Sequence, residues 1–440
     1  MFKKLLCIVL CLILTLSLTG CSIEFKLPDN LFNSSAPQDA ATFLEGILEK
    51  IPFGNSDNFN VSSPSVTLPD APKTEHTPIG RENYYQYALL NDTEKQIYND
   101  ICKGIETQQN YINVKKYKLS DTDLEKIFNK ITADNPQYFW LTKFFQYAYY
   151  NINGKTEITH IILCYTDGAV TDEFDDNNNF ITTADREKIK NQKIEFDKKI
   201  TDFLNSFSKV LPTIEKERLI HDFVLKNIVY AEKELEKPLE RNNYLRIYDV
   251  YGAMVNGYAV CEGYAKLFQY LCYQTGINST LVIGQSEGES HAWNTVNIEN
   301  EWYHIDTTWD DGSTTNGMPL YTYYNLTTAQ ISEDHIIDSS VYAVPKASSE
   351  KYSFKNTYGI VVSRYSKPKN YESAIDYLLK YNCKYLILVC DGNMPTYNYI
   401  KRFFIELNSD VQKYAKTKGQ NLKFKTTYYE VDNFIYLERK

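Results

Sequence analysis

The chain has 440 residues, which is enough for two or three domains, and its hydrophobic content of 43% is ordinary for a globular protein. Its formal net charge is −9 and it carries no basic stripe, so nucleic acid is not expected as a partner. Tyrosine is common, with 37 copies, but its large ring and polar tip suit a core or a binding surface equally and therefore indicate no particular function.

The amino-terminal segment has the composition of a targeting signal. Residues 1–4 form a basic start, and residues 5–18 form an apolar run that is too short to span a membrane comfortably. The run ends in Leu18-Thr19-Gly20-Cys21, which resembles a bacterial lipobox. That resemblance implies a lipoprotein signal peptide over residues 1–20, lipidation of the Cys21 sulfur, and a membrane-anchored place on the extracellular face of the bacterial cytoplasmic membrane. The alternatives are an ordinary secretory signal or an uncleaved anchor.

Two regions follow this signal. Residues 21–83 are rich in Ser, Pro, Asn and Asp, a composition typical of a flexible tether. Residues 84–210 predict an N-terminal α+β domain with three helices. The first covers residues 91–104, the second opens with the capping-box-like sequence of residues 120–123 and stops before Pro136, and the third, a long one, covers residues 183–209. Asn153-Gly154 lies between two β-rich runs and is a strong hairpin signal. None of these residues carries a catalytic signature, so packing against a neighbouring domain or binding a partner is the expected role.

A cysteine opens the next predicted helix. Cys261 is followed by apolar residues at helical spacing, and Gly276 is a plausible stop; the spaced residues are Tyr264, Leu267, Phe268, Leu271 and Cys272. Cys261 is therefore expected on the first turn, where unpaired backbone N–H groups and the positive end of the helix dipole favour a thiolate. Gly257 and Gly263 flank the cysteine and permit close approach of the backbone. A buried structural cysteine is the alternative.

A histidine and an aspartate lie at the ends of a predicted β-hairpin. Residues 292–298 and 302–305 are expected to form its strands, with residues 299–301 at the turn, so that His291 begins the first strand and Asp306 ends the second. If the loop has an even number of residues, the two side chains point to the same face as diagonal neighbours across the strands. The alternatives are a strand-end histidine bound to a backbone carbonyl and an ordinary turn aspartate.

A cysteine, a histidine and an aspartate are what a thiol acyl-transfer enzyme needs, as nucleophile, as base and as the carboxylate that orients the base. Their surroundings read Val-Cys-Glu-Gly-Tyr-Ala at 260–265, His-Ala-Trp-Asn at 291–294 and Trp-Tyr-His-Ile-Asp-Thr-Thr-Trp at 302–309. Together these motifs resemble the transglutaminase-like superfamily, which includes transglutaminases, cysteine proteases and peptide N-glycanases. The resemblance covers residues 212–335, well under half of the chain.

This resemblance implies an α+β fold for a catalytic domain over residues 211–345. The implied core is papain-like: a helix carrying Cys261 packs on an antiparallel sheet carrying His291 and Asp306, and the three side chains form the catalytic triad. The Cys261 backbone N–H is the expected donor to the oxyanion, with Tyr258 as an additional side-chain candidate. The expected substrates are amide bonds of proteins or cell-wall peptides, and hydrolysis is favoured over crosslinking because water is always present.

Other interpretations of the same residues stay open. Cys261, Cys272, His291 and His304 are conceivable zinc ligands, but their spacing is poor for zinc, and His304 is expected to be a half-exposed strand residue. Asp310-Asp311 does not fit a regular calcium loop, so no metal or other cofactor is expected. The competing class of function is a non-catalytic, surface-displayed binding module that retains the transglutaminase-like fold.

The last region, residues 351–440, predicts a small C-terminal α/β domain. The expected order is a strand over 358–363, a helix over 371–381, a strand over 384–390, a helix over 397–417 and two final strands. No glycine-rich phosphate loop is present, so nucleotide binding is unsupported. A structural role and a role in substrate recognition are both compatible with this pattern.

Overall fold

The computed structural model of the protein describes residues 67–440, except residues 71, 153–154, 168–169, 175–179, 183–184, 235–245, 312–317, 364–365, 392–396 and 432. The expected signal peptide, the lipidation site Cys21 and most of the expected tether therefore lie outside the described residues. Two compact units are present: one contains Gln86–Lys198, and the other joins Lys73–Tyr85, Lys199–Lys237 and Arg246–Lys440. Within the described part of the chain, no helix combines the length and the apolar character needed to cross a membrane.

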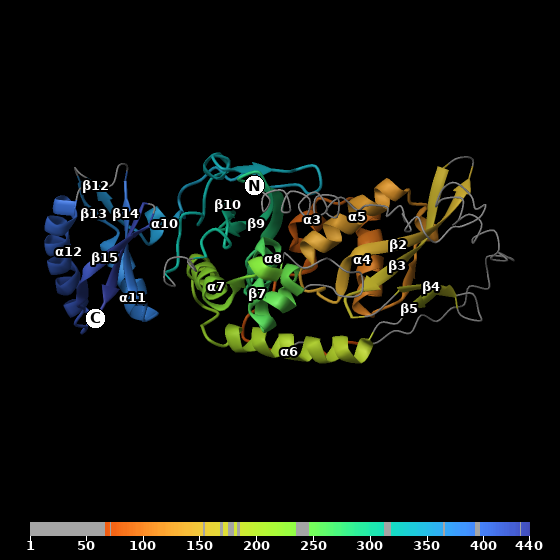
Figure 1. Ribbon diagram of the computed structural model, residues 1–440, viewed down its shortest axis with the longest axis horizontal. Helices are drawn as coiled ribbons and strands as arrows, with labels where there is room; N and C mark the ends of the chain where they lie inside the picture. The colour runs from red at the N-terminus through yellow and green to blue at the C-terminus, as the bar shows by residue number, and fades with distance from the viewer. Residues whose placement is uncertain are drawn as a thin grey trace. The chain divides into compact units, whose positions relative to one another are not determined.

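The first unit combines two capped helices with a three-stranded antiparallel sheet (Figure 1). Helices α4 (Asp92–Glu106) and α5 (Asp121–Asp134) each begin with a capping box. The sheet has the order β1-β3-β2, with β1 at Tyr111–Asn113, β2 at Leu141–Ile152 and β3 at Lys155–Tyr165. Strands β2 and β3 pair as the predicted hairpin, although its two turn residues, 153–154, lie outside the described residues.

Further elements complete this part of the chain. They are α3 (Tyr85–Ala88), the two-stranded sheet of β4 (Val170–Phe174) and β5 (Phe180–Thr182), and α6 (Arg186–Leu204). Helix α6 confirms the predicted long helix but is shorter at both ends. At its carboxyl end the shortfall has a local cause, because the Phe203 carbonyl accepts from the Ser206 backbone N–H and from its hydroxyl, which turns the chain out of the helix.

The second unit contains a four-stranded antiparallel sheet with the order β10-β9-β8-β11 (Figure 1). Its strands are β8 (Ser279–Ser286), β9 (Glu289–Ile298), β10 (Glu301–Ile305) and β11 (His335–Ile337). Helix α8 (Cys261–Gln274) packs on β8 and β9, and α7 (Thr213–Asn227) packs on α8. The predicted core, a cysteine-bearing helix on an antiparallel sheet, is confirmed.

Packing explains why α8 lies where it does. Leu267, Phe268 and Leu271 are fully buried at helical spacing, and burying each side chain contributes about 1.5–3 kcal/mol. The short elements of the second unit are η1 (Arg81–Asn83), β6 (Val229–Tyr230), η3 (Glu232–Glu234), η4 (Arg246–Tyr248), the π-helix η5 (Gly252–Asn256), β7 (Tyr258–Ala259) and α9 (Thr328–Ile331). Element η2 (Lys115–Tyr117) belongs to the first unit.

A five-stranded sheet forms the C-terminal part of the second unit, in the order β13-β12-β14-β16-β15. Strand β12 (Ile360–Ser363) runs parallel to β14 (Tyr385–Cys390), and the other neighbours are antiparallel. The remaining elements are α10 (Phe354–Thr357), β13 (Ser366–Lys369), α11 (Tyr371–Lys380), α12 (Tyr397–Thr417), β15 (Phe424–Val431) and β16 (Phe434–Arg439). The predicted order of helices and strands is confirmed. Strand β13 was not predicted, because its Ser-Lys-Pro-Lys sequence is a poor strand signal that only an edge position tolerates.

Arg218 of α7 connects the C-terminal part of the second unit to the core that contains α8. Its side chain is buried, and its guanidinium carbon lies 3.6 Å from the ring centroid of Tyr377 and 4.3 Å from that of Tyr358. The ring centroids of Phe354 and Tyr321 each lie 5.0 Å from the same guanidinium carbon, so four aromatic rings enclose it. Aromatic faces attract a cation, so this contact holds α7 against α10, α11 and the segment just before β12.

Candidate active site

Cys261 is the first residue of α8, as predicted. The N-cap residue is Val260, whose side chain accepts no hydrogen bond from the first turn, whereas Asn91 and Ser120 cap α4 and α5 with their side chains. A helix start without a side-chain cap keeps its N–H groups available to another acceptor, and the helix dipole favours a thiolate there. The Cys261 side chain is partly exposed, whereas Cys272 on the same helix is buried. The helix therefore presents Cys261, and not Cys272, to a substrate.

Two glycines allow the chain to approach Cys261 closely, as predicted. Gly257 has a φ of +76°, in the left-handed region that favours glycine. At Gly263, a Cβ atom would lie 2.6 Å from the Ile247 carbonyl oxygen and 2.7 Å from the Ala259 Cβ. The first turn of α8 is thus packed directly against the segment before it, and this fixes the position of the cysteine sulfur.

The hairpin of β9 and β10 brings His291 and Asp306 to one face of the sheet. Residues 299–300 form a two-residue turn, and both have positive φ, 51° and 69°, as a type I′ turn requires. The register pairs Ile305 with Asn294, so Asp306 lies one step further along and diagonally across from His291. The loop is even, as the same-face prediction needs, but it is one residue shorter than predicted, and β9 begins two residues before the histidine.

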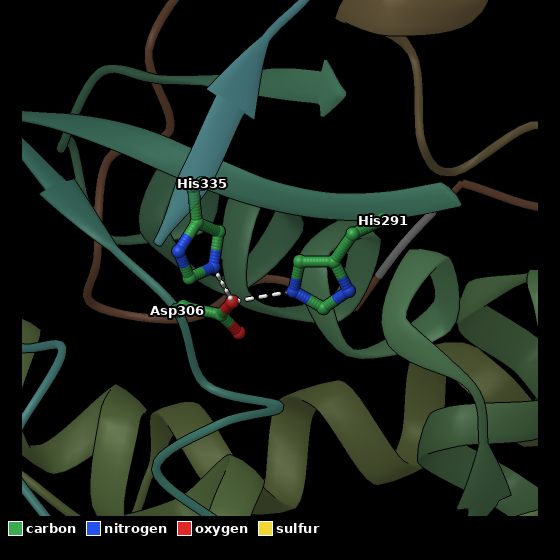
Figure 2. Close-up of side chains that lie close together, drawn as sticks. All are labelled: His291, Asp306 and His335. Atoms are coloured by element: carbon green, nitrogen blue, oxygen red, sulfur yellow. Dashed lines mark hydrogen bonds and ion pairs between the residues drawn. The ribbon is translucent and has the colours of Figure 1, made fainter. Parts of the chain in front are cut away.

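The two side chains form a buried ion pair. His291 Nε2 lies 2.5 Å from Asp306 Oδ2 (Figure 2). Burial by itself would lower the pKa of the imidazole, but the adjacent carboxylate outweighs it and, with Cys261, raises the pKa of His291 to about 10. Burial opposes the charge of Asp306 as well, yet the neighbouring imidazoles hold the pKa of its carboxyl well below the ordinary value. Imidazolium and carboxylate are therefore the stable forms at neutral pH.

The remaining ring nitrogen of His291 faces the cysteine. An ionised carboxylate only accepts, so Nε2 donates to Asp306. The Cys261 thiol is a second hydrogen-bond partner of His291, and it meets Nδ1 because Nε2 is occupied. The Trp293 indole stacks on the imidazole at a centroid distance of 5.9 Å, and Trp309 approaches it edge-on at 6.2 Å. These indoles hold the ring in place and keep water from the ion pair.

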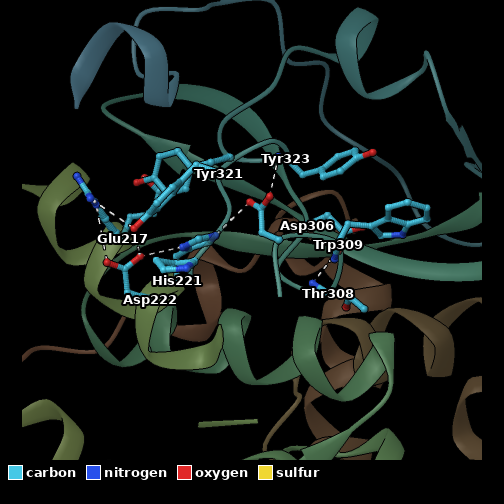
Figure 3. Close-up of polar contacts among 12 residues, drawn as sticks. Glu217, His221, Asp222, Asp306, Thr308, Trp309, Tyr321 and Tyr323 are labelled. Atoms are coloured by element: carbon cyan, nitrogen blue, oxygen red, sulfur yellow. Dashed lines mark hydrogen bonds and ion pairs between the residues drawn. The ribbon is translucent and has the colours of Figure 1, made fainter. Parts of the chain in front are cut away.

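Backbone groups hold the second oxygen of the aspartate. Asp306 Oδ1 accepts from the backbone N–H groups of Thr308, at 2.8 Å, and Trp309, at 3.1 Å (Figure 3). Both donors belong to the turn that follows β10. The carboxylate is thus oriented before any substrate binds, and one oxygen is left for imidazole donors.

The next two aspartates fasten this turn to the helices beneath it. His221 of α7, which Figure 3 shows between Asp222 and the Asp306 turn, is fully buried, and its Nε2 lies 3.1 Å from Asp310 Oδ2. Tyr264 of α8 donates to Asp311 at 2.7 Å. The consecutive aspartates therefore tie the Asp306 turn to α7 and to the helix that carries the cysteine.

The family of this region follows from comparison with known proteins. Residues 201–307 match the family model of the transglutaminase-like superfamily. The chain contains a transglutaminase-like domain. Kyphoscoliosis peptidase of Mus musculus is 32% identical over 115 residues, and that of Homo sapiens is 31% identical over 114; each match covers 22% of this chain and 17% of the relative. This chain thus spans about a sixth of the length of the curated relatives it matches.

A solved structure described as "Crystal structure of a TGase" is similar at 19% identity. The match covers 53% of this chain and 60% of that chain, with a TM-score of 0.24.

The structure places one further side chain beside Asp306 that the sequence analysis missed. His335 Nε2 lies 3.2 Å from the same Oδ2 atom that His291 contacts (Figure 2). His335 lies on β11, a three-residue edge strand whose pairing with β8 has no local sequence signal. The one available signal, an aspartate directly before a histidine at Asp334-His335, is too common to single out.

These side chains fit a hydrogen-bonded group better than a metal centre. Among the described residues, His291, Asp306 and His335 are the set whose ligand atoms lie within 4.8 Å of one another. Tetrahedral zinc ligands at about 2.0–2.1 Å from the metal stand roughly 3.3 Å apart, whereas His291 and Asp306 are 2.5 Å apart. The conceivable zinc ligands Cys272 and His304 are not part of this set.

The expectation that His304 is half-exposed is wrong. Its side chain is fully buried because the chain at Leu326 pairs with β10 and covers it. Trp293 Nε1 donates to His304 Nδ1 at 3.1 Å, and Nε2 lies 3.1 Å from the Thr328 hydroxyl. Burial lowers the pKa of His304 to about 4, so it is a neutral residue that supports the indole on which His291 stacks.

The structure places Tyr258 on β7 with an exposed side chain, three residues before Cys261. Its role as an oxyanion donor stays a prediction. A second tyrosine, Tyr230, lies on the neighbouring strand β6, where it pairs with Ala259. Burial and then the charge of Cys261 raise the pKa of Tyr230, so its ring lies within electrostatic reach of the sulfur.

Proposed function

We propose that the protein is a cysteine-dependent acyl-transfer enzyme of the transglutaminase-like class, acting on amide bonds of proteins or cell-wall peptides. The observation that carries this proposal is the buried ion pair of His291 and Asp306, which contacts Cys261 at an uncapped helix start. A core packs at least as well around apolar side chains as around a buried ion pair. Fold stability therefore does not explain why a buried ion pair lies beside a thiol.

In the first step, the Cys261 thiolate attacks the carbonyl carbon of the amide and a sulfur–carbon bond forms. Negative charge moves to the carbonyl oxygen, where the backbone N–H of the first turn of α8 is the proposed donor. The carbon–nitrogen bond then breaks, and the proton on His291 Nδ1 passes to the leaving amine or ammonia. Asp306 keeps the ring oriented and stabilises its cation until the proton has left.

In the second step, the thioester is resolved. His291 Nδ1 takes a proton from water, the hydroxide adds to the thioester carbon, and the carbon–sulfur bond breaks to return the thiolate. The product is a carboxylate; a lysine amine in place of water would give a crosslink. We propose hydrolysis as the main outcome, and the match to relatives named as peptidases supports it.

The proposed place of this chemistry is the extracellular face of a bacterial cytoplasmic membrane. The support is the lipobox-like sequence that ends at Cys21 and the tether composition of residues 21–83. A lipid anchor with such a tether would bring the enzyme within reach of cell-wall peptides and surface proteins.

The decisive test measures the reactivity of Cys261 and the formation of reaction products separately. Iodoacetamide labelling of the folded protein is measured for each cysteine between pH 5 and 10, in the wild type and in His291→Ala, and casein digests are assayed for new carboxylates and released ammonia. We expect Cys261 to label rapidly below neutral pH only when His291 is present, and Cys261→Ala to abolish turnover while the fold is kept. Ordinary slow labelling that ignores His291, with no product, would establish the competing binding module instead.

A further inference from the structure

Asp306 is shared by two imidazoles. Its Oδ1 atom is occupied by two backbone N–H groups, and its Oδ2 atom accepts from His291 at 2.5 Å and from His335 at 3.2 Å (Figure 2). His335 is fully buried and comes from the edge strand β11, on the far side of the sheet from β10. A triad needs one imidazole on its carboxylate, so the second one requires its own explanation.

The other nitrogen of His335 is also held by a carboxylate. His335 Nδ1 lies 2.5 Å from Asp334 Oδ1, and Asp334 in turn accepts from the Tyr323 hydroxyl at 2.7 Å. Carboxylates and imidazoles thus alternate from Asp334 through His335, Asp306 and His291 to the cysteine. Each of the two histidines is fixed at one nitrogen by Asp306, and the position of that carboxylate is common to both.

The aromatic surroundings keep His335 rigid. Its ring lies 5.0 Å from Trp293, 5.4 Å from Tyr323 and 5.8 Å from Trp309, centroid to centroid. Trp293 and Trp309 are the two indoles that also contact His291. The titratable groups that face His335 are Asp334 on its own segment, Tyr323, Asp306 after β10 and His291 on β9. His304 on β10 lies within electrostatic reach of it.

We propose that His335 is a positioning residue for the proposed acyl-transfer reaction: by donating from Nε2 it holds Asp306 Oδ2 at the place where His291 needs its partner. This role rests on the proposed function. If Oδ2 had only His291, the two backbone donors would still hold Oδ1, but the Oδ2 end of the carboxyl group could tilt, and the imidazole would shift with it. Misplacement of catalytic groups by about 1 Å costs roughly 100-fold in rate.

Two amide substitutions of His335 distinguish the roles of its two ring nitrogens. The amide of His335→Gln reaches the position of Nε2 and can still donate to Asp306, whereas the amide of His335→Asn is one methylene shorter and reaches only the position of Nδ1, beside Asp334. Both remove the ring and its packing, so loss of packing affects both alike. His76→Asn is the matched control, because His76 is also a buried histidine of the second unit and its Nε2 contacts the Leu204 carbonyl instead of the site.

The measurements are the pH profile of Cys261 alkylation by iodoacetamide and the separate kcat and KM for casein peptides. We expect His335→Asn to lower the alkylation rate at pH 6 and kcat by about 10- to 100-fold with little change in KM, and we expect His335→Gln to recover most of the loss. The His76→Asn control should keep the wild-type profile.

Equal losses in the Asn and Gln variants, or a loss of the same size in His76→Asn, would reduce His335 to a packing residue. A wild-type profile in His335→Asn would overturn the proposal outright while leaving the proposed function standing. A wild-type protein whose Cys261 ignores His291 would refute the proposed function, and the role of His335 with it.

Discussion

Replacing Asp306 by asparagine should disable the site through its protons while leaving its shape intact. Only the amide oxygen can accept from the backbone N–H groups of Thr308 and Trp309, so the NH₂ group takes the place of Oδ2. That group is a donor, and His291 must then present Nε2 as an acceptor and carry its proton on Nδ1, facing Cys261. A neutral ring in this tautomer cannot take a proton from the thiol.

The size of the effect follows from the electrostatics of the pair. Without the carboxylate, the pKa of His291 should fall from about 10 toward the ordinary value of about 6.5. At pH 8 the imidazolium form then drops from nearly every molecule to about one in thirty. Together with the wrong tautomer, this should lower kcat by about 1,000- to 10,000-fold.

Nuclear magnetic resonance of labelled histidines measures the titration directly. A Cys261→Ala background removes the coupled thiol, and His291→Ala assigns the resonance among the six histidines. The comparison is between this background and the same protein with Asp306→Asn. A His291 resonance that titrates at the same pH with and without the Asp306→Asn change would refute the electrostatic reasoning. Turnover within tenfold of the wild type in Asp306→Asn with Cys261 intact would refute it as well.

Three further predictions concern the scaffold. Burial raises the pKa of Glu217 to about 8, although the hydrogen bonds from its donors act to lower it. Between about pH 4.5 and 8 the folded state therefore keeps a proton on Glu217 that the unfolded state has lost. Stability should therefore fall as pH rises from about 4.5 to 8, and Glu217→Gln should flatten that fall in urea unfolding at pH 5 and 9; an unchanged slope would contradict the assignment. Gly263→Ala should lower the unfolding free energy by about 1–3 kcal/mol and slow Cys261 labelling, because the added Cβ meets the Ile247 carbonyl. A variant that matches the wild type in both measurements would show that the start of α8 can shift to accommodate the methyl group. Arg218→Met should lower the unfolding free energy by about 2 kcal/mol without moving the His291 titration, and calorimetry that finds no loss would mean that the rings do not depend on the cation.

The parts of the site that local sequence patterns predict are those made by neighbouring residues. Helical spacing after Cys261 places the cysteine on a first turn, and a short hairpin with an even loop brings His291 and Asp306 together. The position of His335 depends on the pairing of the edge strand β11 with β8, and no periodicity in the sequence predicts that pairing. The burial of His304 depends on a segment more than twenty residues further along the chain that pairs with β10. Contacts of this kind become visible only when the sheet is assembled.

The aromatic surround of Arg218 limits how this chain could be rearranged in evolution. The segment that matches the transglutaminase-like family, residues 201–307, contains the arginine but none of the four rings around it. Recombination that joined this segment to a different carboxyl-terminal module would bury a guanidinium without the faces that accommodate it. Helix α7 and the C-terminal part that supplies these rings should therefore be inherited as a pair, so the segment that is inherited as a unit is larger than the segment that matches the family.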